Sequence, residues 1–190
     1  MTESMMKTFL LRLFIVSFSA FLVWQSIQLT QSIIDNVYPL SFRDIVIDSV
    51  LMNLFITGVF LVGYALPVHR LLPDSYYRIS RAKSFSKVCR ILKVEQYRGI
   101  IRFAFWRPRH NKKHFFNGTR SGLVLFEINT RISESGHLFA FLILLPLSLY
   151  IASAVDIRLA VSITLINVLF NFYPLILQRY HRLRLRNTMT

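Results

Sequence analysis

Four apolar stretches, each close to 20 residues long, constrain this chain more than any other feature of its sequence. They run approximately over residues 9–29, 45–66, 137–155 and 159–177. A helix of about 20 apolar residues is long enough to cross the roughly 30 Å of hydrocarbon in a bilayer. We therefore predict an all-α, polytopic membrane protein with about four transmembrane helices, folded as a single membrane domain over residues 1–190.

The composition and the distribution of charge are typical of a membrane protein. Hydrophobic residues make up 54% of the chain and charged residues only 17%, yet the formal net charge is +14. A soluble basic protein would spread its charge over its surface, whereas here the charges avoid the apolar stretches and gather between them. The first stretch begins with charges, as a signal peptide does, but its small-x-small trio, residues 17–19, lies inside the apolar run. We expect this stretch to be retained.

The positions of Lys and Arg predict the orientation, because short loops rich in these residues stay on the cytoplasmic side. Two lie at the N-terminus, one in the first loop, fifteen in the second loop, one in the last turn and four in the tail. Four spans with both termini and the loop 67–136 in the cytoplasm keep all but two of the 23 basic residues inside. We predict a multi-pass protein of the cell membrane with this topology, in which residues 156–158 form the turn of a tight helical hairpin.

The loop over residues 67–136 is too long and too basic to be only a connector. Between Tyr76 and Trp106 it mixes Arg and Lys with Tyr, Phe, Ile and Leu, as amphipathic helices at a membrane interface do. Two interpretations stay open, a positively charged anchor without a ligand or a specific anionic site. We expect membrane lipids as partners and no nucleic acid. Cys89 is the only cysteine, which excludes an intrachain disulfide and a cysteine-based metal cluster.

A polar segment leads into the third stretch and carries the first candidates for chemistry. Thr130, Glu134 and His137 share one helical face at spacings of four and three. A carboxylate beside an imidazole can fix its tautomer and steady the imidazolium, so His137 is a candidate general base and Glu134 its orienting partner. The alternative is an ordinary helix start, in which Glu134 pairs with Arg131 and His137 marks the headgroup boundary. One Glu-x-x-His pair offers only two ligands, so we expect no metal site.

A second polar stripe runs out of the fourth stretch. At about 100° per residue, Asn171, Gln178 and Arg182 are separated by nearly whole numbers of turns, and Asn167 lies about 40° away. Amides are costly in hydrocarbon, so we expect the stripe to face other helices or a wet cavity. Alternatively, the asparagines only hold helices together and the terminal arginines only anchor the chain. Pro174 has no N–H for the carbonyl one turn earlier, and we expect that it bends the helix.

Two motifs, taken in order and with their separation, connect these residues to a known family. The first has the pattern Thr-basic-x-x-Glu-x-x-His before one span, and the second has Asn-x-x-Pro-x-x-x-Gln-Arg-Tyr-x-Arg-x-Arg at the end of the next. The matching residues are Thr130, Arg131, Glu134, His137, Asn171, Pro174, Gln178, Arg179, Tyr180, Arg182 and Arg184. With the aromatic-basic loop that contains Trp106 and Arg107, the chain resembles the glycosyl-4,4'-diaponeurosporenoate acyltransferase family from roughly the second span to the tail.

The resemblance implies a small membrane enzyme that esterifies a hydroxyl with a fatty acyl group, in that family the sugar of a glycosylated carotenoid. This chain departs from the pattern at His181, where the family usually has Asn, and in a longer, more basic segment between Trp106 and Gly118. The departures concern the substrate more than the reaction. We therefore expect a lipid or glycolipid acceptor and do not carry over the carotenoid.

The resemblance also implies roles for individual residues. His137 would deprotonate the acceptor hydroxyl, Glu134 would orient His137, and Asn171 or Gln178 would donate to the developing oxyanion. An acyl donor such as acyl-CoA is amphipathic and anionic, which suits arginine contacts to its phosphates. The substrate-binding candidates are Asn171, Gln178, Arg179, Arg182, Arg184, Arg131 and Trp106. We expect no cofactor beyond this co-substrate.

Two other classes of function stay open. A non-enzymatic lipid-binding or assembly protein would depend on the total positive charge of the loop, and it would function without Glu134 and His137. A small carrier or channel would need the intramembrane amides to line a continuous path, and Asp48 is the only acidic residue within a span that could help. The sequence carries no signal for an oligomeric state.

Overall fold

The computed structural model describes residues 3–35, 39–105 and 120–189. Within these ranges every regular element is helical and no strand is present. Four segments are long and apolar enough to cross a membrane, namely Glu3–Ile34, Phe42–Tyr64, Gly122–Ala154 and Ile157–Leu185. The prediction of an all-α, polytopic membrane protein is confirmed.

The chain divides into two compact units. Unit 1 contains Met1–Val68 and Gly136–Phe172, and unit 2 contains His69–Ser135 and Tyr173–Thr190. The long helix α7 (Arg120–Ala154) contributes its first part to unit 2 and its second part to unit 1. At 35 residues it is much longer than the roughly 20 residues that a bilayer requires.

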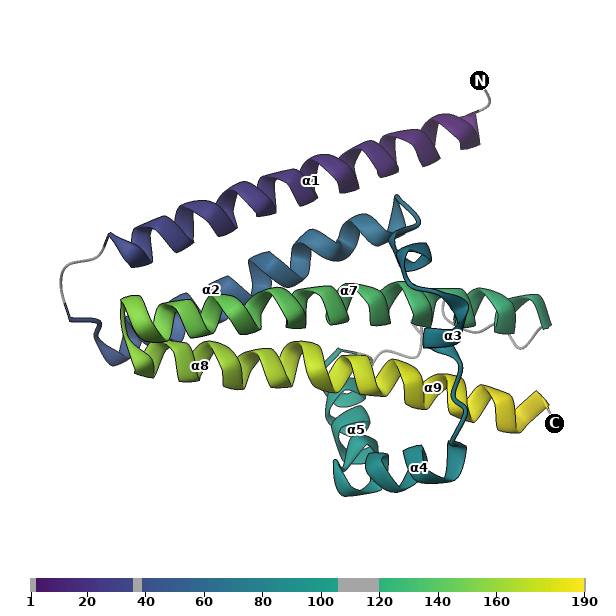
Figure 1. The fold of residues 1–190 in the computed structure, drawn as a ribbon. Helices are drawn as coiled ribbons and strands as arrows, with labels where there is room; N and C mark the ends of the chain where they lie inside the picture. The colour runs from purple at the N-terminus through teal and green to yellow at the C-terminus, as the bar shows by residue number, and fades with distance from the viewer. Residues whose placement is uncertain (1–2, 36–38, 106–119, 190) are drawn as a thin grey trace. The chain divides into compact units, whose positions relative to one another are not determined.

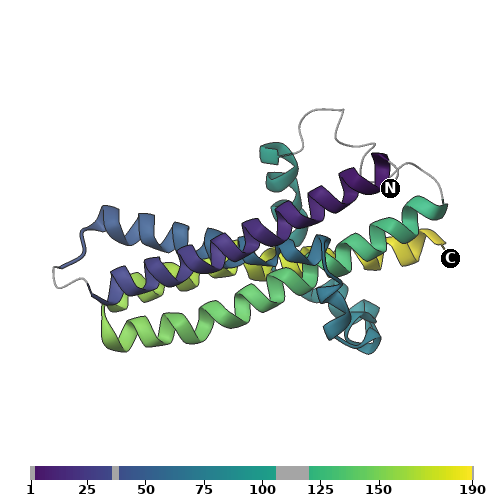
Figure 2. The same ribbon diagram turned by 90° about the horizontal axis from the view of Figure 1, so that it is seen from above.

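Unit 1 is a set of antiparallel helices. Its other elements are α1 (Glu3–Ile34), α2 (Phe42–Val59), the 3-10 turn η1 (Phe60–Tyr64), α8 (Ile157–Asn167) and the π-helical turn η4 (Val168–Phe172). Figures 1 and 2 show that the end of α1, the start of α2 and the connection from α7 to α8 lie at the same end of this unit. This connection is the tight helical hairpin that the sequence predicts.

Short polar side chains start the helices at these connections. Ser41 caps α2, since its hydroxyl accepts a hydrogen bond from the Asp44 amide at 3.2 Å and the Asp44 carboxylate accepts one from the Ser41 amide at 3.1 Å. This reciprocal capping box satisfies two amides that a helix start leaves without partners. Asp156 caps α8 by accepting from the Arg158 amide at 2.7 Å.

Most of the buried side chains of unit 1 are apolar. Its core joins Ile33 and Leu40 with residues of α2, α7 and α8, which are Ile45, Met52, Ile56, Ala140, Leu144, Ile151, Leu159, Ala160 and Ile163. The outward side chains of α1 are also apolar, including Phe9, Leu13 and Phe14. Apolar side chains outside as well as inside are what a helix in contact with lipid requires.

Unit 2 contains the basic loop and the last helix. Its elements are the turn η2 (Val68–Leu71), which starts at the unit boundary, α3 (Asp74–Tyr77), α4 (Ala82–Ile91), α5 (Val94–Phe105), the first part of α7 and α9 (Tyr173–Met189). Lys93 adopts a left-handed φ of 52° between α4 and α5, which allows the chain to turn directly from one helix into the next. Cys89, Val94 and Leu177 form a small core that joins α4, α5 and α9.

Candidate active site

Three buried asparagines in unit 1 form part of a network of neutral polar groups. The Nδ2 of Asn171 donates to the Oδ1 of Asn167 at 3.0 Å, and the Nδ2 of Asn167 donates to the backbone carbonyl of Phe141 at 3.2 Å. The Nδ2 of Asn53, in α2, donates to the carbonyl of Ile163 at 3.2 Å. The bonds to Phe141 and Ile163 join neighbouring helices, and all three bonds satisfy amide donors that would be costly in an apolar surrounding. The buried Oδ1 of Asn53 has no partner among the described residues.

His137 is attached to this network through Asn171. Its Nδ1 lies 3.1 Å from the Oδ1 of Asn171, and the hydroxyl of Thr57 donates to the same oxygen at 3.0 Å. Because the Nδ2 of Asn171 donates to Asn167, its Oδ1 can only accept, so Nδ1 of the imidazole carries the proton. The basic lone pair of the neutral ring is then on Nε2. Thr57 and Asn171 together set the tautomer of His137.

A break in the helical repeat occurs next to Asn171. Val168–Phe172 forms a π-helical turn, and Pro174 follows at the start of α9. Since Pro174 has no N–H, the carbonyl of Phe170 lacks its usual α-helical donor. Single π-helical turns of this kind are frequent at functional sites.

Glu134 is the centre of the charged cluster in unit 2. Its side chain is completely buried, and its Oε1 accepts from the Nε of Arg179 at 2.6 Å. Its Oε2 accepts from the Nη2 of Arg182, whose own side chain is 6% exposed. The hydroxyl of Thr130 accepts a further bond from Arg182 at 3.3 Å. One carboxylate therefore neutralises and fixes two guanidinium groups.

Two tyrosines of the short helix α3 stack on the same arginines. The guanidinium of Arg179 lies 4.4 Å from the ring centre of Tyr76, and its Nη2 donates to the Tyr76 carbonyl at 3.0 Å. The ring of Tyr77 lies 5.1 Å from Arg131 and 5.5 Å from Arg182, while its hydroxyl donates to the carbonyl of His69. Burial, together with the charge of Glu134, raises the pKa of Tyr76 to about 12. Tyr76 is therefore protonated at every physiological pH.

Arg131 belongs to the same unit but has other partners. Its Nη1 donates to Asp74 at 2.6 Å and its Nη2 to Glu127 at 2.7 Å. In the alternative that the sequence left open, Arg131 pairs with Glu134, whereas here Glu134 is bonded by Arg179 and Arg182. The predicted pairing of Glu134 with His137 stays a prediction, because the structure describes the two side chains in different units.

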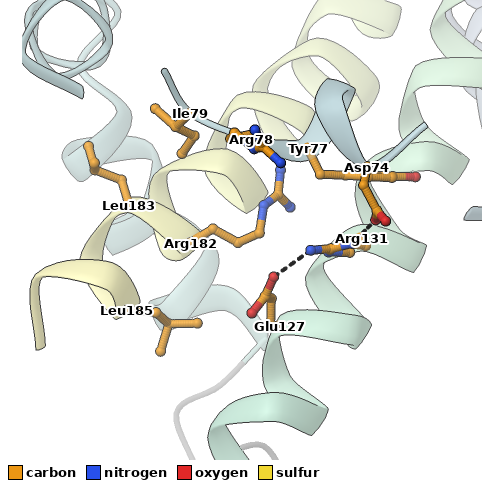
Figure 3. Close-up of a pocket in the computed structure, with 9 residues that line it drawn as sticks. All are labelled: Asp74, Tyr77, Arg78, Ile79, Glu127, Arg131, Arg182, Leu183 and Leu185. Carbon is orange, nitrogen blue, oxygen red and sulfur yellow. Dashed lines mark hydrogen bonds and ion pairs between the residues drawn. The ribbon is translucent and has the colours of Figure 1, made fainter. Parts of the chain in front are cut away.

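A pocket of about 550 Å³ lies against this cluster. Figure 3 shows its lining, in which basic, acidic, aromatic and aliphatic side chains from α3, α7 and α9 and the segment after α3 surround one space. The lining residues are Asp74, Tyr77, Arg78, Ile79, Glu127, Arg131, Arg182, Leu183 and Leu185. The mixture suits a ligand with both charged and apolar parts.

The predicted site residues fall into two groups. Glu134, Arg131, Arg179 and Arg182 meet in unit 2, and their helix α9 also carries the half-buried Gln178 and the exposed Arg184. His137 and Asn171 meet in unit 1. Trp106 lies outside the described residues. Within the described part of the chain, no group of three or more His, Cys, Asp or Glu side chains is placed to hold a metal ion.

Sequence reasoning missed Thr57, Asp74, Tyr76, Tyr77 and Glu127 as members of these clusters. One signal was present for the two acids, because the loop that carries fifteen basic residues contains few acidic ones. A scarce carboxylate among many cations is expected to pair with one of them. No comparable signal marks the two tyrosines, since aromatic residues are frequent throughout the chain.

Comparison with known proteins gives one match. The model of a family described as glycosyl-4,4'-diaponeurosporenoate acyltransferase matches residues 73–190, which is more than half of the chain. The match begins just before α3 and contains His137, Asn171 and the whole charged cluster around Glu134, while α1 and α2 lie outside it. Neither the curated proteins nor the solved structures contain a match. This membrane protein belongs to the glycosyl-4,4'-diaponeurosporenoate acyltransferase family.

Proposed function

We propose that this protein transfers a fatty acyl group from an acyl donor to a hydroxyl group of a lipid or glycolipid acceptor. Membership of an acyltransferase family supports the reaction class. The single observation that carries the proposal is the imidazole of His137, whose Nδ1 is bonded to Asn171 so that Nε2 is left as the basic nitrogen. A neutral imidazole with a fixed tautomer is suited to general-base catalysis.

In the proposed reaction, Nε2 of His137 accepts the proton of the acceptor hydroxyl. The hydroxyl oxygen then forms a bond to the acyl carbonyl carbon, and the bond between that carbon and the donor's leaving group breaks. With a thioester donor such as acyl-CoA the leaving group is a thiolate, which takes the proton back from the imidazolium. No cofactor is needed to balance these steps.

The amides divide into two roles in this proposal. Asn171 uses its Oδ1 for Thr57 and His137 and its Nδ2 for Asn167, so we assign it the orientation of the imidazole. Gln178 is the better candidate for donation to the negative charge that develops on the acyl carbonyl oxygen. The substitution Gln178→Leu would then lower turnover more than it weakens substrate binding.

The arginines would bind the anionic end of the donor. Arg179, Arg182 and Arg184 follow one another along α9, and Glu134 holds the first two in place. We therefore assign Glu134 a positioning role toward the arginines in addition to its predicted role toward His137. A guanidinium that is already fixed loses less conformational entropy when it binds a phosphate.

We also propose that both termini and the loop 67–136 face the cytoplasm of a cell membrane, because the basic residues concentrate there. Single cysteines in a Cys89→Ser background test this topology in intact cells with a membrane-impermeant maleimide. We expect no labelling at Ser84→Cys, in α4, and labelling at Ser153→Cys, at the end of α7. The reverse pattern would exclude the proposed orientation.

The reaction is tested with membranes that contain the protein, radiolabelled palmitoyl-CoA and extracted cellular lipids. Thin-layer chromatography should reveal a labelled lipid that mild alkali cleaves, as an ester does. His137→Gln should lower its formation by at least 100-fold, which is within the range of a lost general base. His69→Gln is the matched control, since it changes a half-buried imidazole of a residue that bonds to Tyr77 only through its backbone carbonyl. Full transfer by a normally inserted His137→Gln protein would remove the basis of the proposal.

One observation favours a second candidate, a non-enzymatic lipid-binding protein. The helices α4 and α5 expose Val88, Ile91 and Ile100 among Lys and Arg side chains, as interfacial helices do on anionic lipid. This candidate predicts that His137→Gln leaves the cellular function intact and that replacing several loop cations together abolishes it. The labelled-ester measurement distinguishes it from the enzyme.

A further inference from the structure

The pocket of unit 2 has one positive charge in excess. Four arginines and three carboxylates lie in or beside it, and every carboxylate is committed to an arginine. Asp74 and Glu127 both bond to Arg131, whereas Glu134 bonds to the remaining pair. The cluster contains Arg78, Arg131, Arg179 and Arg182 against Asp74, Glu127 and Glu134. A ligand that carries a single negative charge would bring this region to neutrality.

The excess charge is on Arg78. This exposed residue follows Tyr77 directly and lines the pocket (Figure 3). Its guanidinium has no hydrogen-bond or ion-pair partner among the described residues. Arg131 and Arg182, by contrast, each have carboxylate partners in the protein.

Unsatisfied donors lie on the two neighbouring arginines. The terminal nitrogens of Arg131 are bonded to Asp74 and Glu127, and those of Arg182 to Thr130 and Glu134. The Nε–H of each is buried and has no hydrogen-bond partner among the described residues. Buried donors without partners are rare and often mark the place of a water, an ion or a ligand. Two of them belong to side chains that line one pocket.

One wall of the pocket is apolar. Ile79, Leu183 and Leu185 contribute aliphatic side chains, and Tyr77 contributes a ring that is held between Arg131 and Arg182. Such a wall suits the part of an amphiphile next to its charged group, and a volume of about 550 Å³ is large enough for a lipid headgroup or a nucleotide phosphate arm.

We infer that this pocket binds the phosphodiester group of an amphipathic ligand. Arg78 would make the charged contact to the phosphate. The lining arginines that Asp74, Glu127 and Glu134 hold in place would form the walls of the pocket. Guanidinium groups match phosphate oxygens in geometry and charge. The inference rests on the proposed function and deepens it, because the ligand would be the acyl donor held by its anionic end. Two sources carry phosphate oxygens of this kind, the headgroup of a phospholipid, with one negative charge, and the diphosphate arm of coenzyme A, with two, of which the pocket would neutralise one.

The test measures binding to the full-length protein in neutral detergent micelles, without turnover. One arm titrates phosphatidylglycerol and follows the bound lipid by native mass spectrometry, and the other titrates coenzyme A by calorimetry. Arg78→Gln should weaken binding at least tenfold in one arm, and that arm identifies the source. Lys83→Gln is the matched control, because it removes an exposed cation of α4 that does not line the pocket. We expect a change of less than twofold there.

Equal losses of binding affinity in Arg78→Gln and Lys83→Gln would show that only the total positive charge of the protein matters, and this would overturn the inference. Absence of binding in both arms would do the same. The proposed reaction is judged separately, since a His137→Gln protein should still bind with its original affinity while it loses ester formation. A protein that transfers acyl groups normally when Arg78→Gln has abolished binding would also contradict the assignment of the pocket to the donor.

Discussion

The two polar clusters of this protein are built from different chemistry. In unit 1, Asn167, Asn171, Thr57 and His137 satisfy one another through neutral amide, hydroxyl and imidazole groups. In unit 2, the centre is the carboxylate of Glu134 between two arginines. Neutral groups are far less costly than charges in segments of membrane-spanning length, whereas arginines and carboxylates require partners or water. In the proposed function, unit 1 would carry out the proton transfer and unit 2 would bind the anion.

The two clusters should also differ in how much stability the protein loses when one of their side chains is removed. The side chains of Asn171 and Glu134 are both completely buried. Removing an amide leaves dipoles without partners, but removing the carboxylate leaves two guanidinium charges without a counterion.

Glu134→Gln should have the largest effect on stability. It keeps the shape of the side chain but removes the charge that holds Arg179 and Arg182, which should cost about 3–5 kcal/mol. The measurement is thermal unfolding of the purified protein in detergent. The control is Glu127→Gln, because Arg131 keeps its bond to Asp74 and the lost pair is half-exposed, so the cost should stay below about 1 kcal/mol. Equal melting temperatures of the two variants would contradict the central role of Glu134.

Asn171→Ala should have an intermediate effect on stability and a large one on activity. It removes the partner of Thr57, His137 and Asn167, which should cost about 1–2 kcal/mol. Because the tautomer of His137 is then no longer fixed, ester formation should fall about 10- to 100-fold. Ser153→Ala, which removes an exposed hydroxyl at the end of α7, serves as the control. An Asn171→Ala protein with undiminished activity would separate Asn171 from the catalytic base.

Two glycines offer a matched test of packing in the two units. A side chain added at Gly58, in α2, would place its Cβ 2.6 Å from the Cδ1 of Leu22, whereas nothing lies within 4 Å of the same position at Gly99, in α5. Gly58→Leu should therefore destabilise unit 1 by about 1–3 kcal/mol. Gly99→Leu should stabilise α5 by up to about 1 kcal/mol, because leucine favours helix. Melting temperatures that shift in the same direction would contradict the close packing of α1 on α2.

The smallest effect is expected at an exposed ion pair of unit 1. Glu3 and Lys7 are 2.6 Å apart, but both side chains are about three-quarters exposed. Water and salt screen such pairs, so Glu3→Gln should leave the melting temperature unchanged within error. A clear loss of stability would mean that burial is not what distinguishes Glu134 from an ordinary surface carboxylate.

Much of the fold and part of the site followed from local sequence. The four apolar stretches gave the helical membrane class, and the motifs around His137 and Asn171 gave the family, which the match over residues 73–190 confirms. The hydrogen-bond partners of the site residues could not be predicted from local sequence. Thr57 bonds to a residue 114 positions away, and Arg182 to one 48 positions away. No local periodicity relates residues at such separations.

The partner of Glu134 illustrates the limit. On a single helix, a spacing of three favours His137 or Arg131 as its neighbour. In the folded chain, α9 brings two arginines to the carboxylate and α3 brings the tyrosines that stack on them. Arginine binds a buried carboxylate more strongly than a neutral imidazole can, so tertiary contacts outweigh the local spacing.

The sequence by itself determined that this chain is helical, that it is a membrane protein and that it belongs to an acyltransferase family. These properties depend on lengths, periodicities and motifs that lie within single segments of the chain. Only the tertiary structure decided which nitrogen of His137 carries its proton and which cations Glu134 neutralises. Both depend on donors and acceptors from distant helices, because a buried polar group takes its properties from whatever the fold places within hydrogen-bonding distance.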